Sequence, residues 1–187
     1  MVDGKRKYEL KKRAADMADT RLRITEAAVE LHGTVGPART TVSAVAERAG
    51  VQRHTVYRHF PTDQDLFAAC SAHFATLHPW PDPTRWKGLA DGLDELYAWY
   101  EQTEGMLTNI FRDAELVDAV PDAMQPMLEF LDAARRSLAR GLPRRRLVTA
   151  AIQHAVDFRT WRSLVRDAGL QRAQALALVT AMIESAA

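Results

Sequence analysis

Cysteine is nearly absent from the sequence, in which Cys70 is the single thiol. One thiol excludes a disulfide within the chain and is typical of proteins that work in a reducing compartment. Cys70 follows the apolar residues LFAA, where a free cysteine packs as a small hydrophobic side chain. We therefore expect Cys70 in the core rather than in a redox sensor, and we expect the protein in the cytoplasm.

Long apolar runs are missing too. No stretch approaches the roughly 20 residues that span a membrane as a helix, and the first residues lack the apolar core of a signal peptide. We expect a soluble protein that has no membrane partner.

The sequence also lacks the motifs that many enzymes and metal sites require. Its six histidines form neither an H-E-x-x-H pattern nor a paired Cys/His pattern. Neither the G-x-S-x-G motif of a serine hydrolase nor the G-x-x-x-x-G-K motif of a phosphate-binding loop occurs. We expect no metal site, no cofactor and no enzymatic activity.

Apolar residues are abundant, and the charges are distributed unevenly. With 187 residues, of which 47% are hydrophobic, the chain can bury a sizeable core. The net charge is only +1, but residues 1–60 contain 12 Lys and Arg against 7 Asp and Glu, and the remainder is acidic. An excess of basic residues is what a surface for nucleic acid requires. The first third of the chain is the candidate for such a surface.

The strongest local pattern lies in residues 39–60, RTTVSAVAERAGVQRHTVYRHF. From Val42 onward, apolar residues recur at the i, i+3, i+4, i+7 spacing of an amphipathic helix. Thr40 or Thr41 is placed to cap its start, and Gly50 lies just past its end. The sequence thus predicts a short helix with both ends marked.

A second short helix is expected after this glycine. Val56 and Phe60 lie one turn apart and would face inward. The step of roughly 100° between helical residues then points His54 and Arg58 most directly outward. Two short helices joined by a glycine turn, the second rich in hydrogen-bond donors, indicate a helix-turn-helix. The alternative is a solvated charged face on an ordinary helical hairpin.

The stretch from Ile24 to Phe67 resembles the DNA-binding domain of the TetR family of bacterial transcriptional regulators. The resemblance rests on ITEAAVEL, then TTVSAVAERAGVQRHTVYRHF, then LF, in one ungapped order. It implies an all-α fold of about nine helices, with a three-helix head that contains the helix-turn-helix and a helical-bundle body for ligand binding and dimerisation.

The resemblance also implies, by position, which side chains meet double-stranded DNA. The residues expected at bases or the nearby backbone are Arg53, His54, Thr55 and Arg58. The residues expected at phosphates or the DNA backbone are Thr41, Ser43, Tyr57 and His59. The chemistry agrees, because arginine can donate two hydrogen bonds to guanine and a tyrosine hydroxyl suits a phosphate oxygen.

One position departs from the family pattern. Asp63 stands where a lysine usually contacts phosphate at the start of the fourth helix, and a carboxylate would repel that phosphate. A structural role is more consistent with the sequence, because Thr62 and Asp65 resemble a capping pair and acidic groups favour a helix N-terminus. We expect Asp63 to support capping, with compensation from the basic N-terminal residues.

We expect three segments along the chain. Residues 1–19 form a basic arm that either lies along DNA or is a disordered tail. Residues 20–61 form the DNA-binding domain, whose first helix runs from Asp19 or Thr20 to His32. Residues 62–187 form the ligand-binding and dimerisation domain.

Apolar stripes predict the helices after this head. One runs from Thr62 to about Leu77 and is ended by three prolines between Pro79 and Pro83. The expected helices beyond it cover 86–100, 106–111 with a possible extension to 117, 121–138, one opened by Pro143, and the last from Leu170. Pro126 lies close to the first turns of its helix, where a kink is possible.

The last two helices are the expected homodimer interface. The helix opened by Pro143 carries a heptad seam of Leu147, Ala151, His154, Phe158, Trp161 and Val165. The final helix is apolar on more than one face, so it requires more than one partner. The resemblance implies a four-helix bundle across a two-fold axis and hence a palindromic operator. The alternative is a seam inside one subunit.

Aromatic and sulfur side chains are frequent in the expected body. Pockets between bundle helices are lined in this way, although aromatic stripes are more often plain core. The candidate ligand contacts are Trp86, Tyr97, Tyr100, Met106, Phe111, Met127, Phe130, His154, Phe158 and Trp161.

The resemblance predicts a repressor that an unidentified small-molecule effector releases from its operator, and a location at the nucleoid. The alternatives are an activator or an effector-independent regulator. A helical-bundle ligand carrier or enzyme with a vestigial DNA-binding head is a further alternative from another class.

Overall fold

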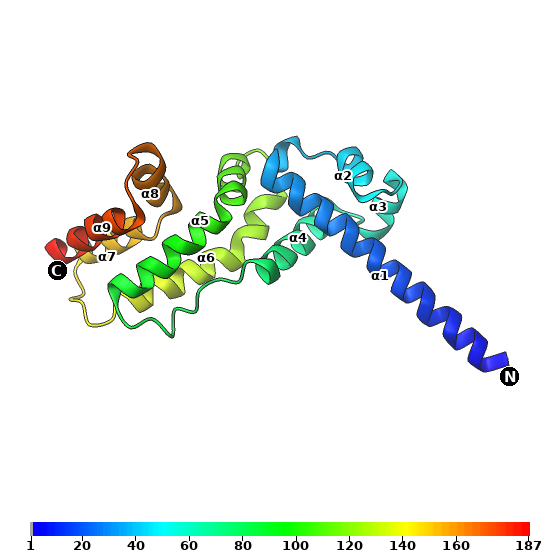
Figure 1. Cartoon of the computed structure of the whole chain (residues 1–187), viewed down its shortest axis with the longest axis horizontal. Helices are drawn as coiled ribbons and strands as arrows, with labels where there is room; N and C mark the ends of the chain where they lie inside the picture. The colour runs from blue at the N-terminus through cyan, green and yellow to red at the C-terminus, as the bar shows by residue number, and fades with distance from the viewer. Residues whose placement is uncertain (1) are drawn as a thin grey trace. The chain divides into compact units, whose positions relative to one another are not determined.

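The chain folds into α-helices (Figure 1). The computed structural model describes the backbone of residues 2–187 and the side chains from residue 8 onward. In this part of the chain there are nine α-helices, two short helical turns and no strand, which confirms the predicted all-α fold. The helices are α1 (Val2–Thr34), α2 (Val42–Ala49), α3 (Arg53–His59), α4 (Asp63–Leu77), α5 (Leu89–Asp113), α6 (Ala119–Leu138), α7 (Arg146–Ala155), α8 (Phe158–Arg162) and α9 (Arg172–Ala186). The turns are the 3-10 helix η1 (Pro37–Arg39) and the π-helical turn η2 (Ser163–Asp167).

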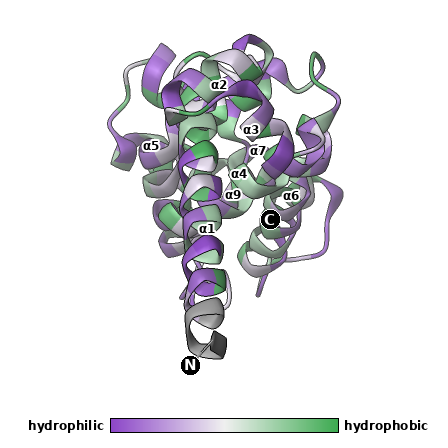
Figure 2. Cartoon of the chain, turned by 90° about the vertical axis from the view of Figure 1, so that its right-hand side faces the viewer, coloured by the Kyte–Doolittle hydropathy of each residue, from purple (hydrophilic) through white to green (hydrophobic). Residues whose placement is uncertain are grey.

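The first helix is longer than expected. The predicted start at Asp19 or Thr20 is wrong, because α1 begins at Val2 and includes the basic arm. Residues 5–19 contain Lys, Arg, Glu, Leu and Ala but neither glycine nor proline, so nothing in them stops a helix. Its N-terminal half extends away from α2, α3 and α4 (Figure 1), and residues 8–19 within it are exposed and mainly hydrophilic (Figure 2). The side chains of Lys5–Lys7 lie outside the described residues.

The predicted helices at 86–100 and 106–111 are one helix, α5. Gly105 is the weakest helix former near their junction, and a single interior glycine costs only about 1 kcal/mol. Trp86 precedes α5, and its indole N–H donates to Glu95 at 3.0 Å. Pro126 lies inside α6, as predicted.

The predicted helix with the heptad seam is interrupted, so the prediction of one continuous seam is wrong. α7 ends at Ala155, and the Asp157 side chain caps α8 by accepting from the Arg159 N–H at 2.7 Å. The Tyr97 and Tyr100 hydroxyls donate to the carbonyls of Ala155 and Val156, at 3.0 and 2.6 Å. These hydrogen bonds satisfy carbonyls that have no helical partner because the helix is interrupted between α7 and α8.

The chain divides into two compact units. Unit 1 comprises residues 1–77 and 108–123, and unit 2 comprises residues 78–107 and 124–187. These units are defined by which residues lie close together in space. The predicted boundary between residues 61 and 62 divides the chain by function instead, and it stays a prediction. None of the helices in the described part of the chain combines the length and the apolar character needed to cross a membrane.

Unit 1 has a core of small and medium side chains. The core residues are Ile24, Ala27, Ala28, Val45, Ala46, Ala49, Val56, Phe60, Leu66 and Cys70. Cys70 is buried, and burial raises the pKa of its thiol to about 12, so it is an unreactive core residue as expected. His32 is buried as well and stacks on Phe67 with ring centroids 4.7 Å apart.

Unit 2 has a core rich in large aromatic rings. Tyr100 contacts Phe158 and Trp161 at centroid distances of 5.4 and 5.9 Å, and Tyr97 lies 6.2 Å from Tyr100. Trp99 adds a fifth ring, 5.7 Å from Tyr100. These five rings are at most 4% exposed, so they form a packed core.

Candidate nucleic-acid interface

The helix α2 has the two end signals that the sequence predicts. The Thr41 hydroxyl oxygen accepts from the Ala44 N–H at 3.1 Å, so Thr41 is the N-cap. Gly50 ends the helix in the left-handed conformation, with φ +65°. The Val51 N–H then bonds back to the Ala46 carbonyl at 2.9 Å, which turns the chain into the next helix.

The helix α3 turns its apolar residues inward and its donors outward. Val56 and Phe60, at the inner face and the C-cap, are 1% and 2% exposed. Arg53, His54 and Arg58 are exposed, and Thr55 is half-buried. The exposures therefore agree with the outward direction that the helical spacing predicts for His54 and Arg58.

The four residues that are predicted to contact the DNA backbone differ in solvent exposure and in their hydrogen bonds. Tyr57 is 47% exposed, and Ser43 is also exposed. The Thr41 oxygen accepts the capping bond, yet its hydroxyl hydrogen is free to donate. His59 is half-buried, and its Nε2 has no hydrogen-bond partner among the described residues. Desolvation and the neighbouring charges of Arg58 and Arg21 lower the pKa of His59, which favours the neutral ring.

Two arginines of α1 support the interface from behind. Arg23 donates to the Ala49 carbonyl at 2.9 Å, at the C-terminus of α2. Arg21 donates to the His59 carbonyl at 2.5 Å, at the C-terminus of α3, and its guanidinium lies 4.0 Å from the centroid of the Phe60 ring. Cations at helix C-termini are favourable, because they meet unpaired carbonyls and the negative end of the helix dipole. Sequence reasoning missed these residues, and their only signal was their basic character.

The start of α4 forms the predicted capping pair. The Thr62 N–H donates to the Asp65 carboxylate at 3.1 Å, and the Asp65 N–H donates to the Thr62 hydroxyl oxygen at 3.1 Å. Asp63 is exposed in the first turn, where an acidic group is favourable.

The predicted ligand residues are only partly brought together. Tyr97, Tyr100, Phe158 and Trp161 share the aromatic core of unit 2, where both tyrosine hydroxyls are already bonded to backbone. Phe130 lies 6.1 Å from Trp99, a residue that the prediction omitted. The buried indole Nε1 of Trp161 has no hydrogen-bond partner among the described residues.

The remaining predicted ligand residues lie elsewhere. Trp86 bonds to Glu95, Met106 and Phe111 are half-buried, and Met127 is buried. His154 is exposed, and its ring lies within hydrogen-bond distance of the Thr160 hydroxyl, 3.2 Å. These two residues line an open hollow of about 340 Å³, together with Asp157, Arg159, Ser163 and Leu164.

Comparison with known proteins identifies the helix-turn-helix. Residues 24–70 match the family model described as bacterial regulatory proteins of the tetR family. An uncharacterised HTH-type transcriptional regulator of Mycobacterium bovis is 40% identical over 63 residues, which are 33% of each chain. The alignment therefore spans about a third of this curated relative.

Solved structures share the fold of the whole chain. A TetR transcription regulator from Haloarcula marismortui has a TM-score of 0.60 at 17% identity, over 90% of this chain and 98% of that chain. A TetR regulator from Rhodococcus sp. RHA1 has a TM-score of 0.54 at 20% identity, over 91% and 97% of the two chains. The multidrug binding protein EbrR, solved with imidazole, has a TM-score of 0.54 at 21% identity, over 87% and 89%. Residues 24–70 therefore form the helix-turn-helix domain of the tetR family of bacterial regulatory proteins, and the chain as a whole shares its all-α fold with TetR regulators of solved structure.

Proposed function

We propose that this protein is a sequence-specific DNA-binding repressor that a small-molecule effector releases from a palindromic operator. The observation that carries the proposal is the geometry of α3. Val56 and Phe60 anchor the helix in the core, while Arg53, His54 and Arg58 stand in solvent. A helix with this arrangement can lie in a major groove and present donors to base edges.

Six of the eight proposed contacts are exposed, and the other two, Thr55 and His59, are half-buried. The proposed base-side contacts are Arg53, His54, Thr55 and Arg58, and the proposed backbone contacts are Thr41, Ser43, Tyr57 and His59.

A homodimer through α7 and α9 is part of the proposal. Leu147 on α7 and Leu178 on α9 are 71% and 53% exposed. Another face of α9 is already buried through Ala175, Val179 and Ile183. A second copy of the chain would cover the exposed leucines, and its two-fold axis would place the two α3 helices about one turn of DNA apart, roughly 34 Å.

Effector binding is proposed for unit 2. The support is the aromatic core, with an unpaired buried indole N–H at Trp161, and the likeness in fold to a multidrug binding protein. An effector that binds better to the released state would weaken operator binding, with a coupling of roughly 1 to 3 kcal/mol.

The double variant Arg53→Ala with Arg58→Ala tests the proposal. Its matched control is Arg144→Ala with Arg162→Ala, which removes the same charge from exposed positions in unit 2. The probe is a duplex that the wild-type protein selects from a random library, compared with a scrambled duplex by fluorescence anisotropy. The α3 variant should lose the preference for the selected duplex, and the control should keep it. Equal preference in both variants would contradict the proposed role of α3.

A further inference from the structure

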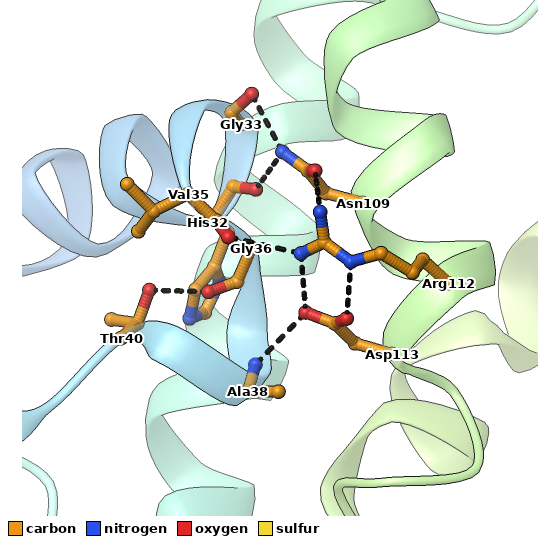
Figure 3. A network of polar contacts seen from close by, with 9 residues as sticks. All are labelled: His32, Gly33, Val35, Gly36, Ala38, Thr40, Asn109, Arg112 and Asp113. Atoms are coloured by element: carbon orange, nitrogen blue, oxygen red, sulfur yellow. Dashed lines mark hydrogen bonds and ion pairs between the residues drawn. The ribbon is translucent and has the colours of Figure 1, made fainter.

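The last turn of α5 holds the turn that leads from α1 into α2 (Figure 3). Asn109 Nδ2 donates to the carbonyls of His32 and Gly33, at 3.0 and 2.9 Å. Arg112 Nη2 donates to the Val35 carbonyl at 2.9 Å. One amide and one guanidinium thus satisfy three carbonyls where α1 ends, groups that have no partner within the helix.

A buried carboxylate completes this arrangement, which we call the α5 clamp and define as Asn109, Arg112 and Asp113. The Asp113 carboxylate accepts from Arg112 at 2.7 and 2.9 Å and from the Ala38 N–H at 3.0 Å. Arg112 also donates to the Asn109 side-chain oxygen at 3.0 Å, so the three side chains orient one another. Asp113 is only 1% exposed, yet each carboxylate oxygen has a donor.

Gly36 is the residue that lets the clamp close. Its φ of +93° is a conformation that residues with a side chain rarely adopt. A Cβ atom there would lie 2.0 Å from Arg112 Nη2 and 2.5 Å from Asp113 Oδ2. The position therefore requires glycine for its backbone conformation and also for space.

The residues that the clamp holds come directly before α2 in the sequence. Ala38 belongs to η1, and the Thr40 hydroxyl donates back to the Gly36 carbonyl at 2.8 Å. The next residue, Thr41, is the N-cap of α2. A fixed turn at residues 35–40 therefore fixes the position at which α2 begins.

The free energy of folding alone does not explain why the chain has such a cluster of charged and polar side chains. An ion pair with a buried partner, such as Asp113, often contributes little to the free energy of folding, because desolvation of the buried charge offsets the attraction between the charges. What a rigid, fully bonded polar cluster does provide is a defined geometry. Geometry is what specific DNA binding requires, because small displacements separate a donor from its base.

We propose that Asn109, Arg112 and Asp113 are positioning residues for specific DNA binding, which set α2 and α3 through the α1–α2 turn. The inference rests on the proposed function, and it adds a route of regulation. α5 runs without interruption from Leu89 to Asp113, so a movement of the helix would also move its last turn. Because the clamp binds this turn to residues 35–38, the start of α2 would move with it. A loosened clamp corresponds to the state that has released the operator.

The variant Asp113→Asn tests the proposal, with Asp132→Asn as its matched control. Asp132 pairs with Arg135 at 2.6 Å on the surface of α6, so the control makes the same charge change at an exposed ion pair. Anisotropy compares the selected duplex with the scrambled one. Asp113→Asn should reduce the ratio of the two affinities by about tenfold or more, a loss comparable to that of one mismatched base pair. Affinity for the scrambled duplex should persist, because it depends on charge rather than on geometry. The control should leave the ratio unchanged.

A second variant keeps the test decisive if Asp113→Asn does not fold. Arg112 has a 43% exposed side chain, so Arg112→Gln removes its charge with less risk to folding. Hydrogen exchange of the Ala38 amide and of the α2 amides should become faster in this variant by about tenfold. Unchanged exchange, or an unchanged affinity ratio in a folded clamp variant, would overturn the proposal.

The hydrogen-exchange measurement tests the role of the clamp independently of the proposed function. A wild-type protein that selects no duplex contradicts the function. The exchange rates of Ala38 and α2 still show, without any DNA, whether the clamp fixes the turn.

Discussion

The two compact units use different side chains to fix their helices. Unit 1 packs alanines and medium-sized residues at its core and holds helix ends with charged groups, such as Arg23 at the Ala49 carbonyl. Unit 2 packs large rings and holds the end of α7 with the hydroxyls of Tyr97 and Tyr100. Small core residues and directional polar bonds specify one geometry, as a DNA-reading surface needs. Large rings bury more apolar area and contribute more to stability.

This comparison can be tested with a built-in reporter. All four tryptophans lie in unit 2, so tryptophan fluorescence follows its unfolding, while hydrogen exchange in α1, α2 and α4 follows unit 1. A variant in unit 2 should mainly change the fluorescence-detected unfolding, and a variant in unit 1 should mainly change the hydrogen exchange.

The largest effect is expected from Trp161→Ala. Trp161 is fully buried between Phe158 and Tyr100, and removal of such a ring typically costs about 3 to 5 kcal/mol in the free energy of unfolding. Urea unfolding followed by fluorescence measures the loss. Trp80→Ala, at a half-buried ring stacked on Phe130, is the control and should cost less. Equal losses would contradict the central place of Trp161 in the core.

Gly36→Ala should be the most damaging small change in unit 1. The substitution combines backbone strain with a clash against Arg112 and Asp113, and together these should cost about 3 kcal/mol. Gly50→Ala also places alanine at a positive φ, +65°, though in the left-handed helical region, and its Cβ would meet only one atom, at 3.8 Å. Hydrogen exchange should show a larger loss for Gly36→Ala. The same loss for both variants would mean that the clamp does not need the space.

Acid should weaken unit 1 through His32. Burial lowers the pKa of His32 from 6.5 to about 4, against a smaller opposite effect of Asp113. Between these values the unfolded chain binds a proton that the folded chain does not, so the free energy of unfolding falls as the pH drops from 6.5 to 4. The loss is at most about 3 kcal/mol, and above pH 6.5 His32 contributes no pH dependence.

The variant His32→Leu isolates this effect. It should flatten the pH dependence of hydrogen exchange in unit 1 over that window. His54→Leu, at an exposed histidine, is the control and should leave the slope as in the wild type. An unchanged slope in His32→Leu would assign the acid sensitivity to other groups.

The smallest expected effect is that of Tyr100→Phe. The variant keeps the ring but removes the hydroxyl that donates to the Val156 carbonyl at 2.6 Å. An unpaired buried carbonyl should cost about 1 to 2 kcal/mol. Tyr57→Phe, at an exposed hydroxyl, should leave the fluorescence-detected transition unchanged.

Features set by neighbouring residues could be predicted from the sequence. The Thr41 cap, the Gly50 turn and the Thr62 and Asp65 capping pair each depend on positions within a few residues of one another, and all are present. The outward side of α3 follows from helical spacing alone.

Features that depend on distant partners could not be predicted. The break between α7 and α8 involves hydroxyls that lie 58 and 56 positions earlier in the sequence. Asn109 and its partner His32 are 77 positions apart. Asp113 gave one signal, because an acidic residue at the C-terminus of a helix is unfavourable unless a tertiary contact compensates for it.

The most direct test of the account is the affinity of the wild-type protein for its selected duplex and for a scrambled duplex, measured from low to physiological salt. The account predicts that the selected duplex binds about 10³-fold more tightly and that the preference survives at physiological salt. Equal affinities that decline together with salt would show that the surface of α3 binds DNA only through charge, which would contradict sequence-specific recognition.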